Sequence, residues 1–184
     1  MRIVGGRFRG KTLSSPEDGS IRPTADRVRE SIFDILGSRI GPNLAGKRVL
    51  DLFAGTGALG LEALSRGADH VIFVDMGAEA RGLIRDHIEA FGAGGVSKLL
   101  RRDATALGPA GTMGPVDLVF LDPPYGRGLA EKALVSLREG GWLKPETLLV
   151  LEEAREAAIA LPAGFALEDR REYGAAAVHL LRVA

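Results

Sequence analysis

The feature that most constrains the fold is a glycine-rich stretch that directly follows a short apolar run. Residues 48–53 read as a buried strand, and the sequence DLFAGTGALG from Asp51 to Gly60 places glycines at positions 55, 57 and 60. Glycines between a strand and a helix let the backbone turn tightly and approach a ligand closely. We therefore expect an open parallel sheet whose strands end at a ligand-binding crevice.

The rest of the chain alternates apolar runs with helical patterns, which is typical of a parallel sheet with helices on both faces. We expect strands at 48–53, 70–74, 97–101, 116–121 and 147–151, and a late hairpin of strands at 166–173 and 176–183. We expect helices at 25–39, 58–66, 78–91 and 128–138, with Thr24 as the N-cap of the first. The predicted organisation is one α/β domain over 1–184, with a basic hairpin and loop at 1–24 and the core at 25–184.

Composition excludes several classes of protein. No run approaches the roughly 18 apolar residues of a membrane span, and the N-terminus lacks the apolar segment of a signal peptide, so we expect a cytoplasmic location. The absence of cysteine excludes disulfides and thiolate metal sites. His70, His87 and His179 have no partner spacing typical of a metal site or a catalytic triad, and we expect His87 at the edge of the core.

Basic residues gather in the first quarter of the chain, although the net charge of the whole is zero. Residues 1–48 hold ten Lys and Arg against five acids, which suggests contact with a polyanion there. Arg7, Phe8, Arg9 and Lys11 place cations beside an aromatic ring, a combination that can pair with phosphate and stack on bases. The alternative is that Phe8 only anchors the hairpin to the core while the cations face water.

A second basic group, Arg22, Arg27 and Arg29, lies at or near the start of the first predicted helix. Cations are disfavoured beside a helix N-terminus. Their presence suggests a nearby anion, which an external ligand or the local acids Asp26 and Glu30 could supply.

Three acids lie near the ends of the first three predicted strands and bear on the identity of the nucleotide. The glycine loop with Asp75, twenty residues after Gly55, fits a dinucleotide or S-adenosylmethionine, since Asp75 can accept both ribose hydroxyls. Asp51 would repel a pyrophosphate but suits the ammonium of a methionine moiety. Asp103 can accept a hydrogen bond from an adenine amine, so the pattern favours S-adenosylmethionine over NAD.

The fourth strand, 116–121, leads into Asp122-Pro-Pro-Tyr125. An exocyclic amine on a base is a weak nucleophile because its lone pair is delocalised into the ring. The Asp122 carboxylate and a carbonyl of the proline segment can accept its N–H groups, while Tyr125 stacks on the base and fixes its plane. This pattern indicates methyl transfer to an amino nitrogen.

At these residues the chain resembles the class I S-adenosylmethionine-dependent methyltransferases that carry an (Asn/Asp)-Pro-Pro-(Tyr/Phe) motif. More narrowly, it resembles the bacterial RsmD-type family of small-subunit ribosomal RNA guanine-N2 methyltransferases. The matching segments are Ile3-Val-Gly-Gly-Arg-Phe-Arg-Gly, Arg22-Pro-Thr-Ala-Asp-Arg-Val-Arg-Glu30, Asp51-Leu-Phe-Ala-Gly-Thr-Gly-Ala-Leu-Gly-Leu-Glu-Ala-Leu-Ser65, Asp122-Pro-Pro-Tyr125 and Gly141-Trp142-Leu143.

The resemblance implies a Rossmann-like, seven-stranded and mostly parallel sheet whose last strand is antiparallel. It implies S-adenosylmethionine as cofactor and ribosomal RNA within a ribosomal particle as partner. From the sequence itself we expect a monomer that binds no metal and no membrane. The implied cofactor residues are Asp51, Phe53, Gly55, Gly57, Asp75, Met76, Asp103, Ala104 and Asp122. The implied catalytic residues are Asp122, Pro123 and Tyr125, and the implied RNA-binding residues are Arg7, Arg9, Lys11, Arg22, Thr24 and Arg27.

Three other functions remain open from the sequence. An adenine-N6 methyltransferase acting on DNA or RNA would share the same chemistry, but a DNA enzyme must flip its base and usually carries a recognition module for which 184 residues leave little room. A nucleotide-dependent oxidoreductase would explain the glycines but not Asp122–Tyr125. An RNA-binding module without activity would not need that motif either.

Overall fold

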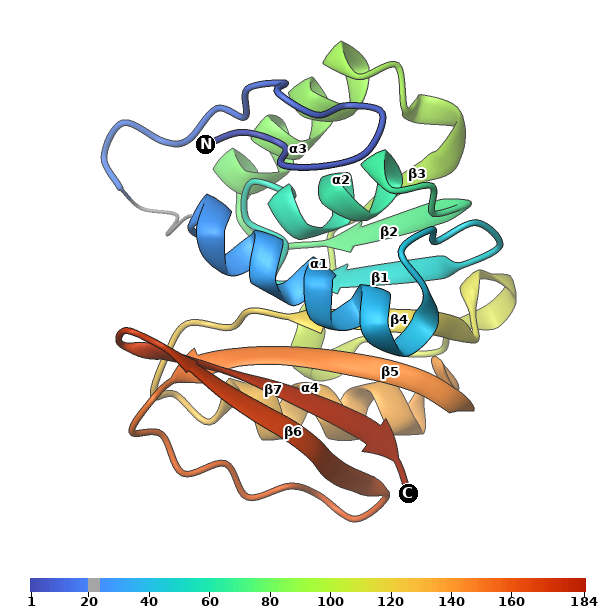
Figure 1. Ribbon diagram of the computed structural model, residues 1–184. Coiled ribbons are helices and arrows are strands. Elements are labelled where there is room, and N and C mark those ends of the chain that lie inside the picture. Colours follow the sequence, from blue (N-terminus) through green and yellow to red (C-terminus); the bar gives the residue numbers. More distant parts are fainter. Residues whose placement is uncertain (20–23) are drawn as a thin grey trace. The chain divides into compact units, whose positions relative to one another are not determined.

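The computed structural model describes residues 1–19 and 24–184, and it divides into two compact units. Unit 1 is Met1–Arg101 and unit 2 is Arg102–Ala184. The strands follow the order β3-β2-β1 in unit 1 and β4-β5-β7-β6 in unit 2 (Figure 1).

The described residues of unit 1 form three parallel strands, of which the first two are almost completely buried and the third is partly exposed. They are β1 (Arg48–Leu52), β2 (His70–Val74) and β3 (Ser97–Leu100). Leu52 pairs with Val74, and Val74 pairs with Leu100, so the three carboxyl ends lie at one edge of the sheet. The apolar runs of the sequence predicted these strands to within one residue at each end.

The described residues of unit 1 form three α-helices, α1 (Asp26–Ile40), α2 (Ala58–Ser65) and α3 (Ala78–Ala90), and the short 3-10 helix η1 (Gly94–Val96) follows them. Every residue of α2 is buried. One side of α2 packs on β1 and β2, and the N-terminal segment is hydrogen-bonded to its last turn, where the Arg7 amide donates to the Ser65 carbonyl at 2.8 Å. An all-round apolar helix is expected where neighbours cover it on several sides.

Two local predictions for the beginning of the chain were wrong. The N-cap of α1 is Ala25 and not Thr24, and no side chain caps that helix. The two expected strands of the N-terminal hairpin reduce to one isolated bridge between Arg2 and Thr12. Backbone bonds from Ile3 to Lys11 and from Leu13 to Met1 still close the hairpin.

Unit 2 holds four strands: β4 (Val116–Leu121), β5 (Leu143–Ala154), β6 (Phe165–Tyr173) and β7 (Ala176–Val183). The strand β4 is parallel to β5, whereas β7 is antiparallel to both β5 and β6. The strand β5 extends beyond the predicted 147–151 because its ends also find partners, Leu143 with Val116 and Ala154 with Ala176.

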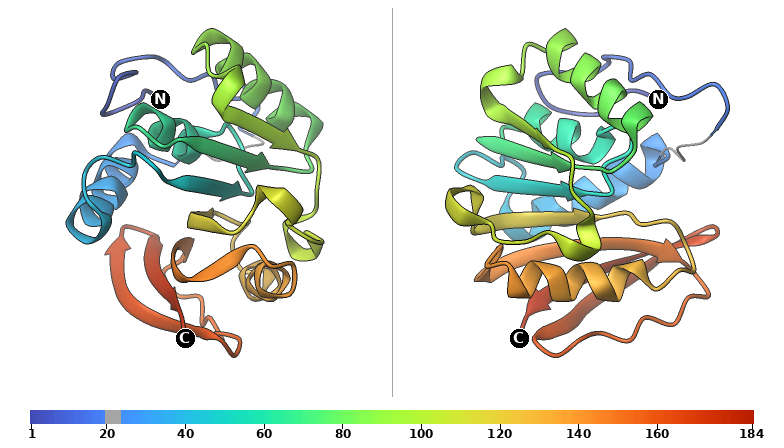
Figure 2. Two further views of the ribbon diagram at one scale, coloured as in Figure 1. Left: turned by 90° about the vertical axis from the view of Figure 1, so that its right-hand side faces the viewer. Right: turned by 180° about the vertical axis from the view of Figure 1, so that it is seen from behind.

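One α-helix, α4 (Leu129–Glu139), packs against β5 in unit 2 and lies along one face of that sheet (Figure 2, right). Two 3-10 helices, η2 (Ala104–Ala106) and η3 (Gly111–Met113), precede β4. The indole of Trp142 is fully buried and donates to the Gly108 carbonyl at 2.9 Å. This bond ties the loop between η2 and η3 to the segment that leads into β5.

Candidate functional site

The glycine loop of unit 1 begins where β1 ends and turns directly into α2. Phe53 has a φ of 54°, Gly55 of 59° and Gly57, the N-cap of α2, of 82°. Residues with side chains rarely adopt this left-handed backbone, so the glycines at 55 and 57 adopt it without strain, whereas Phe53 adopts it in spite of its side chain. Asp51 is 1% exposed, and its Oδ2 accepts the amide of Gly60 at 3.0 Å. A carboxylate is favourable near a helix N-terminus, and this one fixes the first turn of α2.

Asp75 follows β2 and holds the glycine loop from the neighbouring strand. Its Oδ2 accepts the Gly55 amide at 2.9 Å, and its Oδ1 accepts the Gly77 amide at 2.8 Å. The Asp75 side chain is half-buried, and the next residue, Met76, is 52% exposed. Unit 1 thus brings Asp51, Asp75 and the glycine loop to one edge of its sheet, as the sequence predicted. A carboxylate among backbone amides at this edge can accept hydroxyl donors.

His87 is a residue whose importance the sequence did not indicate. It is 4% exposed on α3, and its Nδ1 lies 2.9 Å from the Thr56 carbonyl inside the glycine loop. The amide of Ser14 donates to its Nε2 at 2.9 Å. The Nδ1 atom therefore carries the proton of a neutral ring, and burial lowers the pKa of His87 below its ordinary value. His87 connects the N-terminal segment, the glycine loop and α3.

The N-terminal segment of unit 1 presents the predicted RNA-binding cations. Arg7, Arg9 and Lys11 are exposed, and the Arg7 guanidinium lies 4.5 Å from the centroid of the Phe8 ring. Phe8 itself packs against Phe91, with ring centroids 5.0 Å apart. The anchoring interpretation is therefore correct for Phe8, while the three cations remain on the surface.

A serine at the end of α2 fixes the bend of this segment. The Oγ of Ser65 donates to the Gly5 carbonyl at 2.5 Å and accepts the Phe8 amide at 2.9 Å. Gly6 has a φ of 75°, and a Cβ atom there would lie 2.0 Å from the Ser65 carbonyl oxygen. Only glycine fits this position, which means that the exposed cations are carried by a rigid turn.

A buried ion pair explains one cation at the start of α1. Arg29 and Glu62 are both fully buried, and the Arg29 Nε lies 3.2 Å from the Glu62 Oε2. Arg29 also pairs with Asp26 at 3.0 Å, so acids of the chain itself supply the anion for this arginine. The other Glu62 partners are the amides of Val4 at 3.1 Å and Gly5 at 2.9 Å, and Arg66 at 3.1 Å.

The remaining predicted RNA-binding residues differ in their surroundings. Arg27 is exposed on α1. Thr24 is 8% exposed, and its carbonyl accepts the Arg29 Nη1 at 3.2 Å. Arg22 lies outside the described residues. The part of these residues in RNA binding stays a prediction.

In unit 2, Asp103 is the N-cap of η2. Its Oδ1 accepts the amide of Thr105 at 2.8 Å and the Thr105 hydroxyl at 2.7 Å. These two bonds, the hydroxyl first, lower the pKa of Asp103, because they favour the ionised form. Asp103 is exposed, whereas Ala104 is 4% exposed. The acid is thus held ionised at the surface, where it can accept a hydrogen bond from a ligand.

The segment Asp122–Tyr125 follows the carboxyl end of β4. Asp122 and Tyr125 are half-buried and Pro123 is buried. The Tyr125 hydroxyl donates to the Oε1 of Glu152 at 2.7 Å, and the amide of Gly126 donates to the Oε1 of Glu153 at 3.1 Å. The sequence analysis missed these two glutamates. Their signal was the position of two acids directly after the apolar run 148–151, similar to the pattern that identified Asp51 and Asp75.

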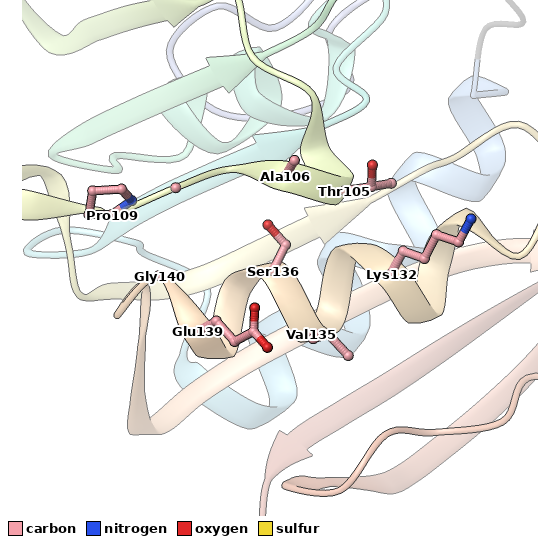
Figure 3. A pocket seen from close by; sticks show the side chains of 9 residues that line it. Thr105, Ala106, Pro109, Lys132, Val135, Ser136, Glu139 and Gly140 are labelled. Carbon is pink, nitrogen blue, oxygen red and sulfur yellow. The ribbon is translucent and has the colours of Figure 1, made fainter.

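A cavity of about 370 Å³ lies in unit 2 where α4 faces the loop that contains η2 (Figure 3). Its lining includes Thr105, Lys132, Ser136 and Glu139, and the Ser136 hydroxyl points toward the loop and accepts the Leu107 amide at 2.7 Å. None of the predicted site residues lines this cavity, so its shape bears on none of their proposed roles.

Membrane-spanning helices and clustered metal ligands are both absent from residues 1–19 and 24–184. No helix there is long and apolar enough to cross a membrane. No group of three or more His, Cys, Asp or Glu side chains in the same residues is arranged to hold a metal ion.

Comparison with known proteins gives matches over nearly the whole chain. The family model described as conserved hypothetical protein 95 matches residues 1–182. The ribosomal RNA small subunit methyltransferase D of Escherichia coli K12 is 36% identical, over 98% of this chain and 88% of that protein. The protein of the same name from Haemophilus influenzae is 31% identical, over 95% and 89% of the two chains.

Comparison of structures agrees with comparison of sequences. The solved structure of yhhF from Escherichia coli matches with a TM-score of 0.83 and 33% identity, and covers 100% of this chain and 98% of that one. The fold is therefore the predicted one: an α/β, Rossmann-like class I methyltransferase fold with a seven-stranded, mostly parallel sheet in which β7 is antiparallel to both of its neighbours, β5 and β6.

Proposed function

The chain belongs to the RsmD-type family, whose model matches residues 1–182, and we propose that it transfers a methyl group from S-adenosylmethionine to the N2 amine of a guanine in small-subunit ribosomal RNA. One observation carries the proposal. Asp122-Pro-Pro-Tyr125 stands intact at the end of β4 in a chain that aligns along 98% of its length with a ribosomal RNA small subunit methyltransferase D.

The residues of unit 1 fit the methionine and ribose parts of S-adenosylmethionine. The half-buried Asp75 carboxylate next to the exposed Met76 suits a ribose, since a carboxylate can accept both hydroxyls. Gly55 and Gly57, with positive φ, leave the loop backbone open to close approach. Asp51 is almost fully buried and binds the Gly60 amide. We infer that it serves the methionine end through the loop it holds, as does the neighbouring Phe53.

The residues of unit 2 supply the adenine and target-base contacts in this proposal. Asp103, held ionised by Thr105, accepts the adenine amine, and the buried Ala104 forms an apolar contact with the ring. Asp122 accepts an N–H of the target amine and Pro123 contributes its carbonyl. Tyr125 stacks on the base.

Bound S-adenosylmethionine supplies a methyl group on a positively charged sulfur, so the transfer needs no metal ion. The protein orients the acceptor. When the Asp122 carboxylate accepts an N–H of the guanine amine, it draws the nitrogen toward a tetrahedral geometry and aims its lone pair. The stacked Tyr125 ring holds the base in one plane. Orientation and local charge of this kind are the main catalytic contributions available here.

The exposed cations of the N-terminal segment, Arg7, Arg9 and Lys11, supply the RNA contact, joined by the predicted Arg22, Thr24 and Arg27. A guanidinium group can form bidentate hydrogen bonds with a phosphate. The Ser65 contacts keep the turn rigid, which lowers the entropy lost when RNA binds. We place the substrate in a ribosomal particle in the cytoplasm, and the active form as a monomer.

The experiment that tests the function uses tritiated S-adenosylmethionine and small ribosomal subunits that lack the modification. The RNA is then digested to nucleosides, which are separated and counted. Label in N2-methylguanosine supports the proposal. Label in N6-methyladenosine would transfer the function to an adenine methyltransferase, and no label despite cofactor binding would contradict enzymatic activity on this acceptor.

The variant Asp122→Ala separates chemistry from cofactor binding. We expect methylation to be lost while the dissociation constant for S-adenosylmethionine stays within about threefold, because one hydrogen bond to the amine is removed and the cofactor loop is untouched. Asp34→Ala, on the exposed side of α1, is the matched control. A large loss of cofactor affinity in Asp122→Ala would show that Asp122 serves the cofactor rather than the base.

The double variant Arg7→Ala/Arg9→Ala tests the RNA surface. We expect weaker binding of RNA and a slope of log affinity against log salt that is shallower by about 0.7 for each phosphate that is no longer neutralised. The control Arg171→Ala removes an exposed cation of β6 in unit 2. Equal salt slopes for the wild type and the double variant would assign both arginines to structure alone.

A further inference from the structure

Two consecutive glutamates near the end of β5 are buried and reach the segment that follows β4. Glu152 is 6% exposed and Glu153 is 3% exposed. The strand β5 is parallel to β4, and Leu151 pairs with Leu121. The two glutamates therefore begin one residue past the last pair of this register, at the same edge of the sheet as Asp122–Tyr125.

Each glutamate binds a different part of that segment. The Oε1 of Glu152 accepts the Tyr125 hydroxyl at 2.7 Å, a length typical of a strong O–H···O bond. The Oε1 of Glu153 accepts the Gly126 amide at 3.1 Å and the Ala154 amide at 2.9 Å. The tip of the tyrosine ring and the backbone just after it are thus held from one strand.

Burial of these carboxylates has a free-energy cost that an apolar pair would not have. The hydrogen bonds that the two carboxylates accept offset part of this cost. The phenol ring can rotate about two side-chain bonds, Cα–Cβ and Cβ–Cγ. The hydroxyl oxygen lies on the axis of the second bond, so its bond to Glu152 fixes the direction in which the Tyr125 ring points. Because a phenolic O–H prefers the plane of its ring, the same bond also favours one ring plane.

We propose that Glu152 is a positioning residue: through its bond to the Tyr125 hydroxyl, it holds in place the ring on which the target base stacks and favours one ring plane, while Glu153 fixes the backbone at Gly126. This inference rests on the proposed function, because it assumes that Tyr125 contacts the base. It assigns a role to the hydroxyl that distinguishes tyrosine from phenylalanine at this position. The expected loss falls on kcat, since orientation matters most in the transition state.

The test is a double-mutant cycle on the labelled-subunit assay. We expect Tyr125→Phe and Glu152→Ala each to lower kcat about tenfold with KM for S-adenosylmethionine within about twofold. The double variant should be no slower than either single variant, because both remove the same bond. Glu152→Gln retains a carbonyl acceptor and should recover most of the rate. Glu146→Ala, at an exposed position of the same strand, is the control.

A second measurement reports on the ring without any activity. The chain has two tyrosines, so ¹³C-labelled tyrosine gives few ring signals, and Tyr173→Phe assigns them. We expect Glu152→Ala to shift the Tyr125 ring signals and leave those of Tyr173 in place. If Glu152→Ala does not fold, the isosteric Glu152→Gln and Tyr125→Phe carry the comparison.

Several results would overturn the inference: independent, multiplying losses in the double variant, an unchanged kcat in Tyr125→Phe, or unchanged Tyr125 ring signals in Glu152→Ala. Failure of the proposed function looks different. In that case the wild type itself leaves guanine unlabelled, while the ring signals still report whether Glu152 restrains Tyr125.

Discussion

Glu62 is the side chain on which the N-terminal part of unit 1 depends most heavily, and Glu62→Ala is the perturbation that tests this. The carboxylate is fully buried and accepts hydrogen bonds from Arg29 at 3.2 Å, from Arg66 at 3.1 Å, and from the amides of Val4 at 3.1 Å and Gly5 at 2.9 Å. Removal of this residue leaves the fully buried Arg29 charge with less compensation and two amides without their acceptor.

The magnitude follows from the burial of the pair. Removal of one partner of a buried ion pair costs about 3–5 kcal/mol. Asp26 still pairs with Arg29 at 3.0 Å, so we expect the lower end, about 3 kcal/mol. A chain of 184 residues loses about 2–4 °C in Tm for each kcal/mol. We therefore expect the Tm of Glu62→Ala to be about 6–12 °C below that of the wild type.

Thermal unfolding followed by circular dichroism or calorimetry measures this difference, with Glu89→Ala at an exposed position of α3 as control. We also expect faster trypsin cleavage after Arg7 and Arg9, because the residues before them are no longer held. The double variant Arg29→Met/Glu62→Leu replaces the pair with apolar side chains and should recover much of the loss. A Tm within about 2 °C of the wild type in Glu62→Ala would refute the reasoning.

Two further predictions concern the glycine loop and its neighbours. Because burial lowers the pKa of His87, the unfolded chain binds a proton there that the folded chain does not, so stability falls as the pH drops below about 6.5, by up to about 1.4 kcal/mol per pH unit for this group. His87→Asn should be less stable at pH 7.5 but should show a shallower pH dependence in urea unfolding, and parallel curves would contradict this. Gly60→Ala would place a Cβ atom 2.4 Å from the ring of Phe73. We expect a Tm lower by several degrees, about 1–3 kcal/mol of overpacking, and no change in thermal unfolding would contradict it.

Much of the fold could be predicted because its signals are local. Apolar runs identified β1 to β5 and β7, the turn at Gly174 identified β6 as the hairpin partner of β7, and helical spacing identified α1 to α4, since these patterns depend only on neighbours in the sequence. Where the ends were wrong, tertiary contacts decided them. β5 is longer than expected because β4 and β7 pair with its ends. Ala25 rather than Thr24 caps α1.

Local patterns were sufficient to identify the acids and glycines that follow the strands, because a parallel sheet brings the carboxyl ends of neighbouring strands to one edge. Tertiary packing decided instead which charged and polar residues are buried and which partners they bind. Arg29 reads as a surface cation at a helix start, yet it pairs with Glu62, 33 positions away. His87 is hydrogen-bonded to Ser14, which lies 73 positions away in the sequence, and Glu152 is hydrogen-bonded to Tyr125, which lies 27 positions away. The partner of a buried polar group is set by packing between distant segments, and no local pattern in the chain encodes it.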